Sequence, residues 1–428
     1  MDAQIFEVME AEVRSYCRNF PVVFSKGRSA TLTDDSGRDY IDMLAGAGVL
    51  NYGHNTPAIR QAVVDYLMQD GVAHALDMYT VAKRDFLTAL RDIILAPRGL
   101  DYKVTFPGPT GTNAVETAFK FARRATGRQN VIAFTNGFHG MTLGALAASA
   151  TGSKRGGAGV ALANVTRVPY DNYVRDLDSA AYLDTLLSDS GSGIDAPAAI
   201  IVETVQAEGG LNTASAEWLR SIAAVARRHG ALLIVDDIQT GCGRTGTFFS
   251  FEDMGFTPDM VCLSKAIGGI GMPMSLLLMR PELDVLKPGE HNGTFRGNNL
   301  AFVAATAALE FWRDPQFAAG LALKADEIHG CLSELARRYS AAGAHVRGRG
   351  LMLGLGWDNP EIAAQVSKCA FENGLIVETT GANDQVLKLL PPLTITEDEL
   401  RRGLEALVTS VDEVMAAQRS APSLEAAE

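Results

Sequence analysis

The sequence predicts an α/β protein in which a mainly parallel sheet carries the functional residues. Short apolar runs recur along the chain at residues 131–134, 198–202, 231–235 and 259–263. Runs of this length and composition are typical of strands that are buried on both faces. A polar segment follows each run, and ligands bind at the carboxyl ends of the strands in open α/β sheets. We therefore expect the functional site at this edge of the sheet.

The N-terminal part of the chain predicts a small hairpin. Residues 30–33 and 40–44 contain β-branched, aromatic and apolar side chains, and Gly37 lies between them. Two such segments around a glycine-containing turn are typical of paired antiparallel strands.

Residues 104–109 predict a strand, and the segment TGTNAVE that follows opens a helix running through Arg124. The first turn of a helix presents free N–H groups and the positive end of the helix dipole. Gly111 and Thr112 are therefore candidates for binding a phosphate group. The segment GPTGTN lacks the Gly-Lys-Ser/Thr ending of a Walker loop, so a nucleotide P-loop is not indicated.

The strand predicted at 131–134 is followed by the turn Asn136-Gly137-Phe138-His139-Gly140. Phe138 is a candidate for stacking on a flat ring, because aromatic pairs favour offset stacking. His139 has two open roles, a hydrogen bond to the backbone or to a substrate.

An acid and an amine end two neighbouring predicted strands. Asp236 and Asp237 follow the run 231–235, and Lys265 follows the run 259–263. Pyridoxal phosphate needs both groups, because it forms a Schiff base with a lysine and an acid keeps its ring nitrogen protonated. Either residue alone is more often a cap or a solvated charge. Together they predict Lys265 as the Schiff-base lysine and Asp236 as the partner of the ring nitrogen.

The segment between these two residues also contains a G-x-G-x-x-G pattern, at Gly241 to Gly246. In dinucleotide-binding proteins this pattern opens a helix after a strand. Here the aromatic, turn-like segment TFFSFEDMG follows it, so a nicotinamide-dependent dehydrogenase is not indicated.

Composition and charge exclude several classes of protein. The net charge of −12 over 428 residues argues against a general nucleic-acid or anionic-membrane surface. No apolar run approaches the roughly 18 residues of a membrane span, and no signal peptide is indicated. The five cysteines are scattered and the seven histidines form no H-x-x-x-H pair, so neither disulfides nor a metal site is expected. We expect a cytoplasmic protein.

The segments VDDIQTGCGRTG and LSKAIGGIG resemble the class III, or omega-amino, aminotransferases. The resemblance implies the type I fold of transferases dependent on pyridoxal 5′-phosphate, with a seven-stranded sheet. It also implies that Gly111 and Thr112 bind the cofactor phosphate, that Phe138 and Ile238 pack on its ring, and that Gln239 bonds its phenolic oxygen.

The same resemblance implies a homodimer with shared active sites, and leaves open whether dimers pair further. HNGTFRGN places Thr294 against the partner subunit's phosphate, and Tyr79 falls in a region that reaches the neighbouring site. The implied domains are an N-terminal segment of a small α+β domain at 1–55, a large cofactor domain at 56–317 and the C-terminal part of the small domain at 318–428.

Two further positions concern the substrate. ETVQAEGG places Glu208 at the family's gate glutamate, which pairs with a carboxylate-binding arginine. Lys388 stands where the family has that arginine. A lysine offers a point charge and not a bidentate fork, so whether Lys388 binds a substrate carboxylate is left open.

Several segments, including RGLDYKVTFPGPTGTNAVE and AFENGLIVETTG, resemble the subgroup of diaminobutyrate–2-oxoglutarate aminotransferases of ectoine biosynthesis. This resemblance implies amino transfer from L-glutamate to L-aspartate 4-semialdehyde. The alternatives are an ornithine, 4-aminobutyrate or lysine aminotransferase, an aminomutase acting on glutamate 1-semialdehyde, and a non-catalytic protein on the same fold.

Overall fold

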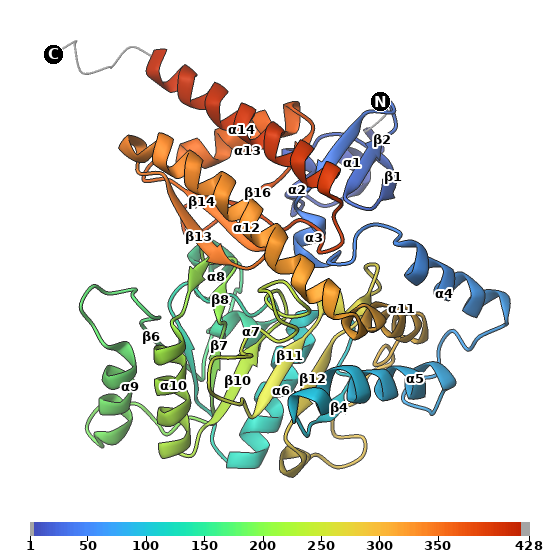
Figure 1. Ribbon diagram of the computed structural model, residues 1–428. Coiled ribbons are helices and arrows are strands. Elements are labelled where there is room, and N and C mark those ends of the chain that lie inside the picture. The colour runs from blue at the N-terminus through green and yellow to red at the C-terminus, as the bar shows by residue number, and fades with distance from the viewer. Residues whose placement is uncertain (1–3, 421–428) are drawn as a thin grey trace.

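The computed structural model describes residues 4–420, and its largest feature is a seven-stranded sheet in the lower half of Figure 1. Its strands, in spatial order, are β4 (Lys103–Thr105), β12 (Leu276–Met279), β11 (Met260–Leu263), β10 (Leu232–Asp236), β7 (Ala199–Val202), β5 (Val131–Phe134) and β6 (Val165–Val168). β12 runs antiparallel to β11 and β4, whereas β10, β11, β7, β5 and β6 pair in parallel. The predicted α/β class and mainly parallel sheet are confirmed.

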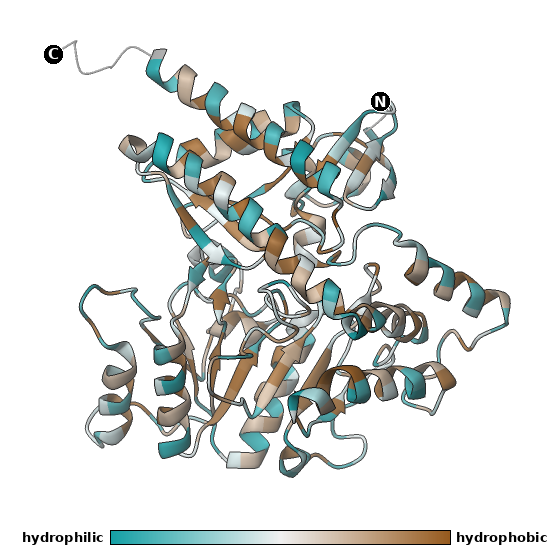
Figure 2. Cartoon of the chain, in the orientation of Figure 1, coloured by the Kyte–Doolittle hydropathy of each residue, from teal (hydrophilic) through white to brown (hydrophobic). Residues whose placement is uncertain are grey.

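Helices cover both faces of this sheet, which explains why its inner strands β5, β7, β10, β11 and β12 are almost entirely apolar (Figure 2). They include α4 (Pro57–Met68), α5 (Val81–Ala89), α6 (Gly111–Thr126), α9 (Ser179–Ser188), α10 (Ala216–Arg228) and α11 (Asn299–Leu309). α6 buries Val115, Ala118, Phe119 and Ala122 at helical spacing against one face. The side chain of Ser215 caps α10 by accepting a hydrogen bond from Trp218 N.

The two ends of the chain share a second core, seen as the blue and the orange-to-red segments at the top of Figure 1. One sheet joins β1 (Phe24–Arg28), β2 (Thr31–Asp34), β3 (Asp39–Asp42) and β15 (Leu375–Ile376). The predicted N-terminal hairpin is β2–β3, and β15 pairs with β3 in parallel. The other sheet joins β13 (His345–Arg349), β14 (Met352–Gly356), β17 (Val386–Leu389) and β16 (Glu378–Thr380).

Three long helices, α12 (Pro315–Arg338), α13 (Pro360–Glu372) and α14 (Glu397–Ser420), pack on these sheets. The expected domain boundary at 317/318 falls within the first turn of α12. Residues 1–3 and 421–428 of the expected domains lie outside the described residues.

Short elements connect the larger ones. They are α1 (Gln4–Met9), α2 (Tyr16–Asn19), α3 (Ala45–Gly48), η1 (Leu90–Leu95), η2 (Ala96–Arg98), α7 (Leu143–Ala148), α8 (Gly152–Gly156), β8 (Val205–Gln206), β9 (Asn212–Thr213), η3 (Lys265–Gly268), η4 (Pro281–Leu283), η5 (Glu310–Arg313) and η6 (Ser340–Ala342). Between residues 4 and 420, no helix has both the length and the apolar character needed to cross a bilayer.

Candidate active site

A cavity of about 160 Å³ lies at the carboxyl ends of β10 and β11, where the sequence predicts the site. Its lining brings together eight of the predicted site residues: Gly111, Thr112, Phe138, Glu208, Asp236, Ile238, Gln239 and Lys265. They come from the start of α6, from the loops after β5 and β7, and from the ends of β10 and β11. The open α/β sheet therefore gathers at one edge residues that are far apart in the sequence.

Lys265 is separated from the end of β11 by Ser264 alone and lies in the cavity wall. Its backbone has φ of 52°, in the left-handed region that non-glycine residues seldom adopt. Such strain is concentrated at functional sites. The Nζ amine donates a hydrogen bond to Ala47 O at 3.0 Å. Burial lowers the pKa of Lys265, although the negative charge of Glu208 opposes this. A lowered pKa favours the neutral amine, which is the reactive form of a lysine.

Asp236 is the last residue of β10 and is buried. Its Oδ2 accepts a hydrogen bond from His139 Nδ1 at 2.7 Å, and its Oδ1 accepts one from Ile238 N at 3.2 Å. His139, for which the sequence left two roles open, thus contacts the predicted acid itself. These two donors stabilise a carboxylate at this position and fix its orientation.

The start of α6 packs against Ile238. A Cβ atom added to Gly111 would lie 3.0 Å from Ile238 Cδ1, so the Ile238 side chain would have to shift to accommodate any other residue here. The predicted phosphate site and the predicted ring contact are therefore neighbours. Phe138, on the loop after β5, is held through its backbone N–H, which donates to Glu203 Oε2 at 2.9 Å.

Gln239 has an unsatisfied polar atom. Its Nε2 donates to Ala47 O at 2.8 Å and to Glu208 Oε1 at 3.3 Å, whereas its Oε1 is buried and has no hydrogen-bond partner among residues 4–420. A buried acceptor without a partner costs free energy, and a ligand that donates a hydrogen bond would remove this cost. With an amine, an acid, a helix N-terminus and apolar walls, the cavity fits pyridoxal 5′-phosphate.

Lys388 lies behind Glu208 and is completely buried, with a side chain 0% exposed. Its Nζ lies 2.8 Å from Glu208 Oε1 and 3.0 Å from Glu378 Oε1. Burial by itself would raise the pKa of Glu208, but the charges of Lys388 and Lys265 lower it to about 2. Lys388 does not line the cavity; it reaches the cavity wall through its ion pair with Glu208 and is already held by two carboxylates.

Tyr79 and Thr294 do not line the cavity of their own chain. The Tyr79 side chain is fully exposed, and Thr294 O accepts a hydrogen bond from His74 Nε2 at 2.8 Å. Their predicted roles at a shared site require a second chain, so both remain predictions.

The G-x-G-x-x-G segment has a structural role. Arg244, within it, is buried and donates hydrogen bonds to Leu351 O, Pro391 O and Asn51 Oδ1. Arg244 therefore connects the loop after β10 to the N-terminal segment at Asn51 and to the C-terminal segment at Leu351 and Pro391. The segment VRGRGLMLGLGW forms the β13–β14 hairpin, and Gly348 and Gly350 adopt positive φ values at its turn.

Sequence reasoning missed two acids beside the cavity. Glu203 directly follows β7, so the rule that found Asp236 could have found it. Burial and the charge of Asp236 raise the pKa of Glu203. Glu378 carries no comparable signal, because its partners Lys388 and Tyr16 are brought to it only by the fold.

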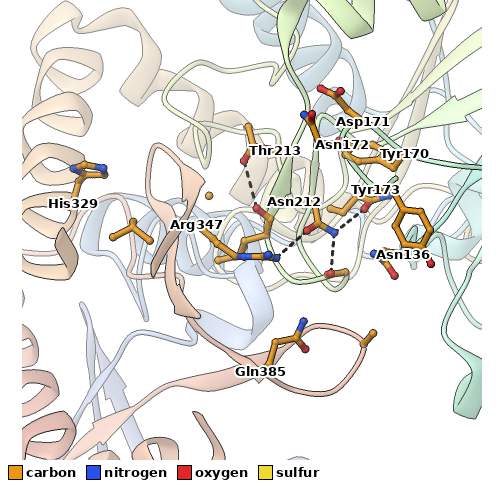
Figure 3. A pocket seen from close by; sticks show the side chains of 16 residues that line it. Asn136, Tyr170, Asp171, Asn172, Tyr173, Asn212, Thr213, His329, Arg347 and Gln385 are labelled. Carbon is orange, nitrogen blue, oxygen red and sulfur yellow. Dashed lines mark hydrogen bonds between the residues drawn. The ribbon is translucent and has the colours of Figure 1, made fainter. Parts of the chain in front are cut away.

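A second, larger cavity of about 580 Å³ lies behind the loop that carries Glu208 and shares no lining residue with the first (Figure 3). Arg347 donates from its side chain to Gly210 O at 2.9 Å and to Asn212 Oδ1 at 3.0 Å. Arg349 donates to Ser250 O and Thr204 Oγ1. Both arginines therefore support the loops beside the active site.

The aminotransferase class-III family model matches residues 13–411. The diaminobutyrate–2-oxoglutarate transaminases of Halalkalibacterium halodurans and Nocardia farcinica are each 53% identical to this chain, covering 96% of it and 96% and 95% of their own lengths. The solved ornithine aminotransferase of Toxoplasma gondii superposes with a TM-score of 0.83 at 28% identity, covering 97% of this chain and 95% of its own. Because these similarities span nearly the whole chain, it belongs to the class III aminotransferases.

Proposed function

We propose that this chain is a diaminobutyrate–2-oxoglutarate transaminase, which transfers the amino group of L-glutamate to L-aspartate 4-semialdehyde. The products are L-2,4-diaminobutyrate and 2-oxoglutarate. The observation that carries the proposal is a cavity lined by both Lys265 and Asp236, in a chain 53% identical over 96% of its length to transaminases of this name.

The chain uses pyridoxal 5′-phosphate, as class III aminotransferases do. When bound, this cofactor supplies an electron sink for negative charge on the reacting carbon of the substrate. Asp236 would hold the proton on the ring nitrogen. The other residues assigned to the cofactor are those around the same cavity: Gly111 and Thr112 for the phosphate, Phe138 and Ile238 for the two faces of the ring, and Gln239 for the phenolic oxygen.

Lys265 carries the proton transfer. We assign to its Nζ the removal of a proton from the carbon that bears the amino group, acting as a general base. Burial lowers the pKa of Lys265, which increases the fraction of neutral amine available for this role. Its hydrogen bond to Ala47 O and its constrained backbone keep the amine in the cavity wall.

Glu208, which lies between the cavity and Lys388, is assigned to the substrate. A substrate carboxylate has to compete with Glu208 for the Lys388 ammonium group. We therefore propose that Lys388 binds a substrate carboxylate and that Glu208 controls access to it.

We further propose that two chains form the active unit. His74 bonds to Thr294, so the segments around residues 74 and 294 lie together, and exposed apolar side chains surround them: Leu76, Met78, Tyr79 and Phe295. A second copy of the chain would bury this surface, and Tyr79 and Thr294 would then reach the partner's cavity. We place the enzyme in the cytoplasm, which its five free cysteines favour, and its product in ectoine biosynthesis.

The proposal is tested with purified enzyme, pyridoxal 5′-phosphate, L-glutamate and L-aspartate 4-semialdehyde, by measuring the 2-oxoglutarate formed. The reverse reaction is measured in parallel by supplying 2-oxoglutarate with L-2,4-diaminobutyrate, L-ornithine, 4-aminobutyrate or L-lysine as the amino donor. We expect diaminobutyrate to be the preferred donor. Preference for any of the other three amines would contradict the proposed substrate while leaving the reaction class in place.

Lys265→Ala is the matched control for the chemistry. It is expected to retain the cofactor without a covalent bond and to lose turnover by several powers of ten, because no other described amine lines the cavity. Borohydride reduction followed by mass spectrometry should label the wild type at Lys265 and leave the variant unlabelled. Normal turnover in the variant would show that Lys265 is not the base.

A further inference from the structure

A network of four side chains lies behind the cavity and contains one cation and two acids. Lys388 lies on β17 and Glu378 directly opposite it on the antiparallel strand β16. Glu378 Oε1 lies 3.0 Å from Lys388 Nζ, and Glu378 Oε2 accepts a hydrogen bond from Tyr16 OH at 3.2 Å. Glu208 completes the network at 2.8 Å from Lys388.

The two acids differ in their position relative to the cavity. Glu208 lines it together with Lys265, and its side chain is 23% exposed. Glu378 does not line it, and its side chain is only 8% exposed. A ligand can therefore displace Glu208 from Lys388, whereas Glu378 stays in place because β16 and Tyr16 hold it.

The charges of this network do not cancel. One ammonium group and two carboxylates leave a net charge of −1 next to the reacting amine of Lys265. If Glu378 were neutral, the network would have no net charge, and an anion would bind beside it at lower cost. Glu378 thus weakens the attraction of Lys388 for any carboxylate that enters the cavity.

The substrates of the proposed function differ in whether the reacting carbon itself bears a carboxylate. Glutamate and 2-oxoglutarate carry one carboxylate on the reacting carbon and a second one three carbon–carbon bonds away. In diaminobutyrate and aspartate 4-semialdehyde the reacting carbon is terminal, and the carboxylate is three carbon–carbon bonds away. The charge of the network therefore acts unequally on the two pairs of substrates.

We propose that Glu378 is a specificity-determining residue: by neutralising Lys388 from the side away from the cavity, it limits the affinity for substrates with a carboxylate on the reacting carbon. This inference rests on the proposed function. It assigns to Glu378 a role in balancing the two half-reactions, without direct contact with the reacting atoms.

The test is Glu378→Gln, which removes the charge and keeps the size of the side chain. Each half-reaction is followed separately by the absorbance change of the holoenzyme, with glutamate or with diaminobutyrate. We expect the apparent dissociation constant for glutamate to fall roughly three- to ten-fold, because the repulsion between the Glu378 carboxylate and the glutamate carboxylate is removed at a partly buried site. The constant for diaminobutyrate should stay within about two-fold.

Three controls separate charge from structure. Glu378→Asp keeps the charge and should keep the wild-type ratio of the two constants, and Tyr16→Phe removes only a hydrogen bond and should change the ratio less than Glu378→Gln. Glu361→Gln makes the same change in net charge at an exposed position on α13 and should have no effect. Calorimetric titration of the holoenzyme with glutarate, which cannot react, should show tighter binding in Glu378→Gln.

Equal changes for both amino donors, or weaker binding of glutamate and glutarate, would overturn the inference. If Glu378→Gln does not fold, Glu378→Ala is the second neutral variant and has to show the same shift in the ratio. Failure of the wild type to react with diaminobutyrate would overturn the proposed function instead, so the two failures are distinguishable.

Discussion

The reactivity proposed for Lys265 depends on its backbone conformation and on its burial. A positive φ at a residue with a side chain costs roughly 1–2 kcal/mol, and this conformation persists only where the surrounding fold imposes it. Here β11 precedes the residue and η3 begins at it, so both flanks are fixed. The Nζ amine is thereby directed at the same cavity as Asp236, and burial favours its neutral form.

Asp236→Asn tests the role of the acid at the same scale. The amide has nearly the same shape and can still accept from Ile238 N, but it cannot hold a proton on the cofactor's ring nitrogen by charge. We expect the turnover number to fall by roughly 10²- to 10³-fold. A cofactor analogue methylated at the ring nitrogen carries a fixed positive charge, so it should restore part of the activity. Wild-type turnover in the variant would remove Asp236 from the mechanism.

Lys388→Met tests the ion-pair network. It leaves the buried Glu378 without its cation and removes from the partly buried Glu208 its direct ion-pair partner, which should lower the free energy of unfolding by roughly 3–5 kcal/mol at pH 8. The thermal unfolding midpoint measures this loss. The double variant Lys388→Met/Glu378→Gln contains one unpaired acid fewer and should be more stable than the single variant.

The loss in Lys388→Met should depend on pH. In the wild type the pKa of Glu208 is about 2, below its usual 4.5, so its contribution to stability is present above pH 4.5 and is lost as pH falls toward 2. Without Lys388, burial raises the pKa of this acid, so the folded variant takes up a proton as pH falls from 8 to 5. The difference in the free energy of unfolding between the variant and the wild type should therefore become smaller over that range. A difference that grows would contradict the ion pair assigned to Glu208 and Lys388.

At the scale of elements, the start of α6 and the end of β10 form one binding surface. α6 packs on the sheet through its apolar face, which places Gly111 against Ile238. Binding of the phosphate group and the ring of the cofactor would thus depend on the position of α6 relative to β10. No single residue sets that position.

Gly111→Ala should disturb this surface. The added methyl group would lie 3.0 Å from Ile238, so the side chain or the helix has to shift, which typically costs 1–3 kcal/mol. We expect roughly ten-fold weaker cofactor binding, measured by titrating the apoenzyme with pyridoxal 5′-phosphate. Gly152→Ala, also at the first residue of a helix but with nothing within 4 Å of its Cβ, is the matched control. Equal effects of the two substitutions would show that contact with Ile238 is unimportant.

At the scale of the whole molecule, the chain has an exposed apolar surface in addition to its cavity. Met78, Tyr79 and Phe295 are exposed in the single chain. Exposed apolar groups that cluster in this way are typical of interfaces between subunits. The two predicted site residues absent from the chain's own cavity, Tyr79 and Thr294, lie in the same region.

The double variant Tyr79→Asp/Phe295→Asp should therefore dissociate the enzyme, because each subunit would place two charges in the interface. Sedimentation should give twice the chain mass for the wild type and the mass of one chain for the variant. Activity should fall with dissociation, since each site would lose the residues supplied by its partner. A wild type that is active as a monomer would contradict the shared site.

Local patterns were sufficient for the strands and for the residues at their ends. Four apolar runs located β5, β7, β10 and β11 to within one residue, and the polar residues after them line the cavity. The β13–β14 hairpin is not evident from the sequence, because an apolar glycine-rich segment does not show where the chain reverses. Glu203 follows β7 and could have been found from its place after a strand, but its contact with the Phe138 backbone is visible only in the fold.

The sequence by itself determined the parallel sheet, the edge at which the cavity lies, and the presence there of the acid and the amine to which we assign the chemistry. These follow from strand burial and from the polarity of parallel strands, which are properties of short segments. Only the tertiary structure decided that Lys388 is held by two acids and that Tyr16 bonds to Glu378, 362 residues away. The pairing of buried charges depends on which distant strands and loops come into contact, and the residue pattern within one segment does not specify those long-range contacts.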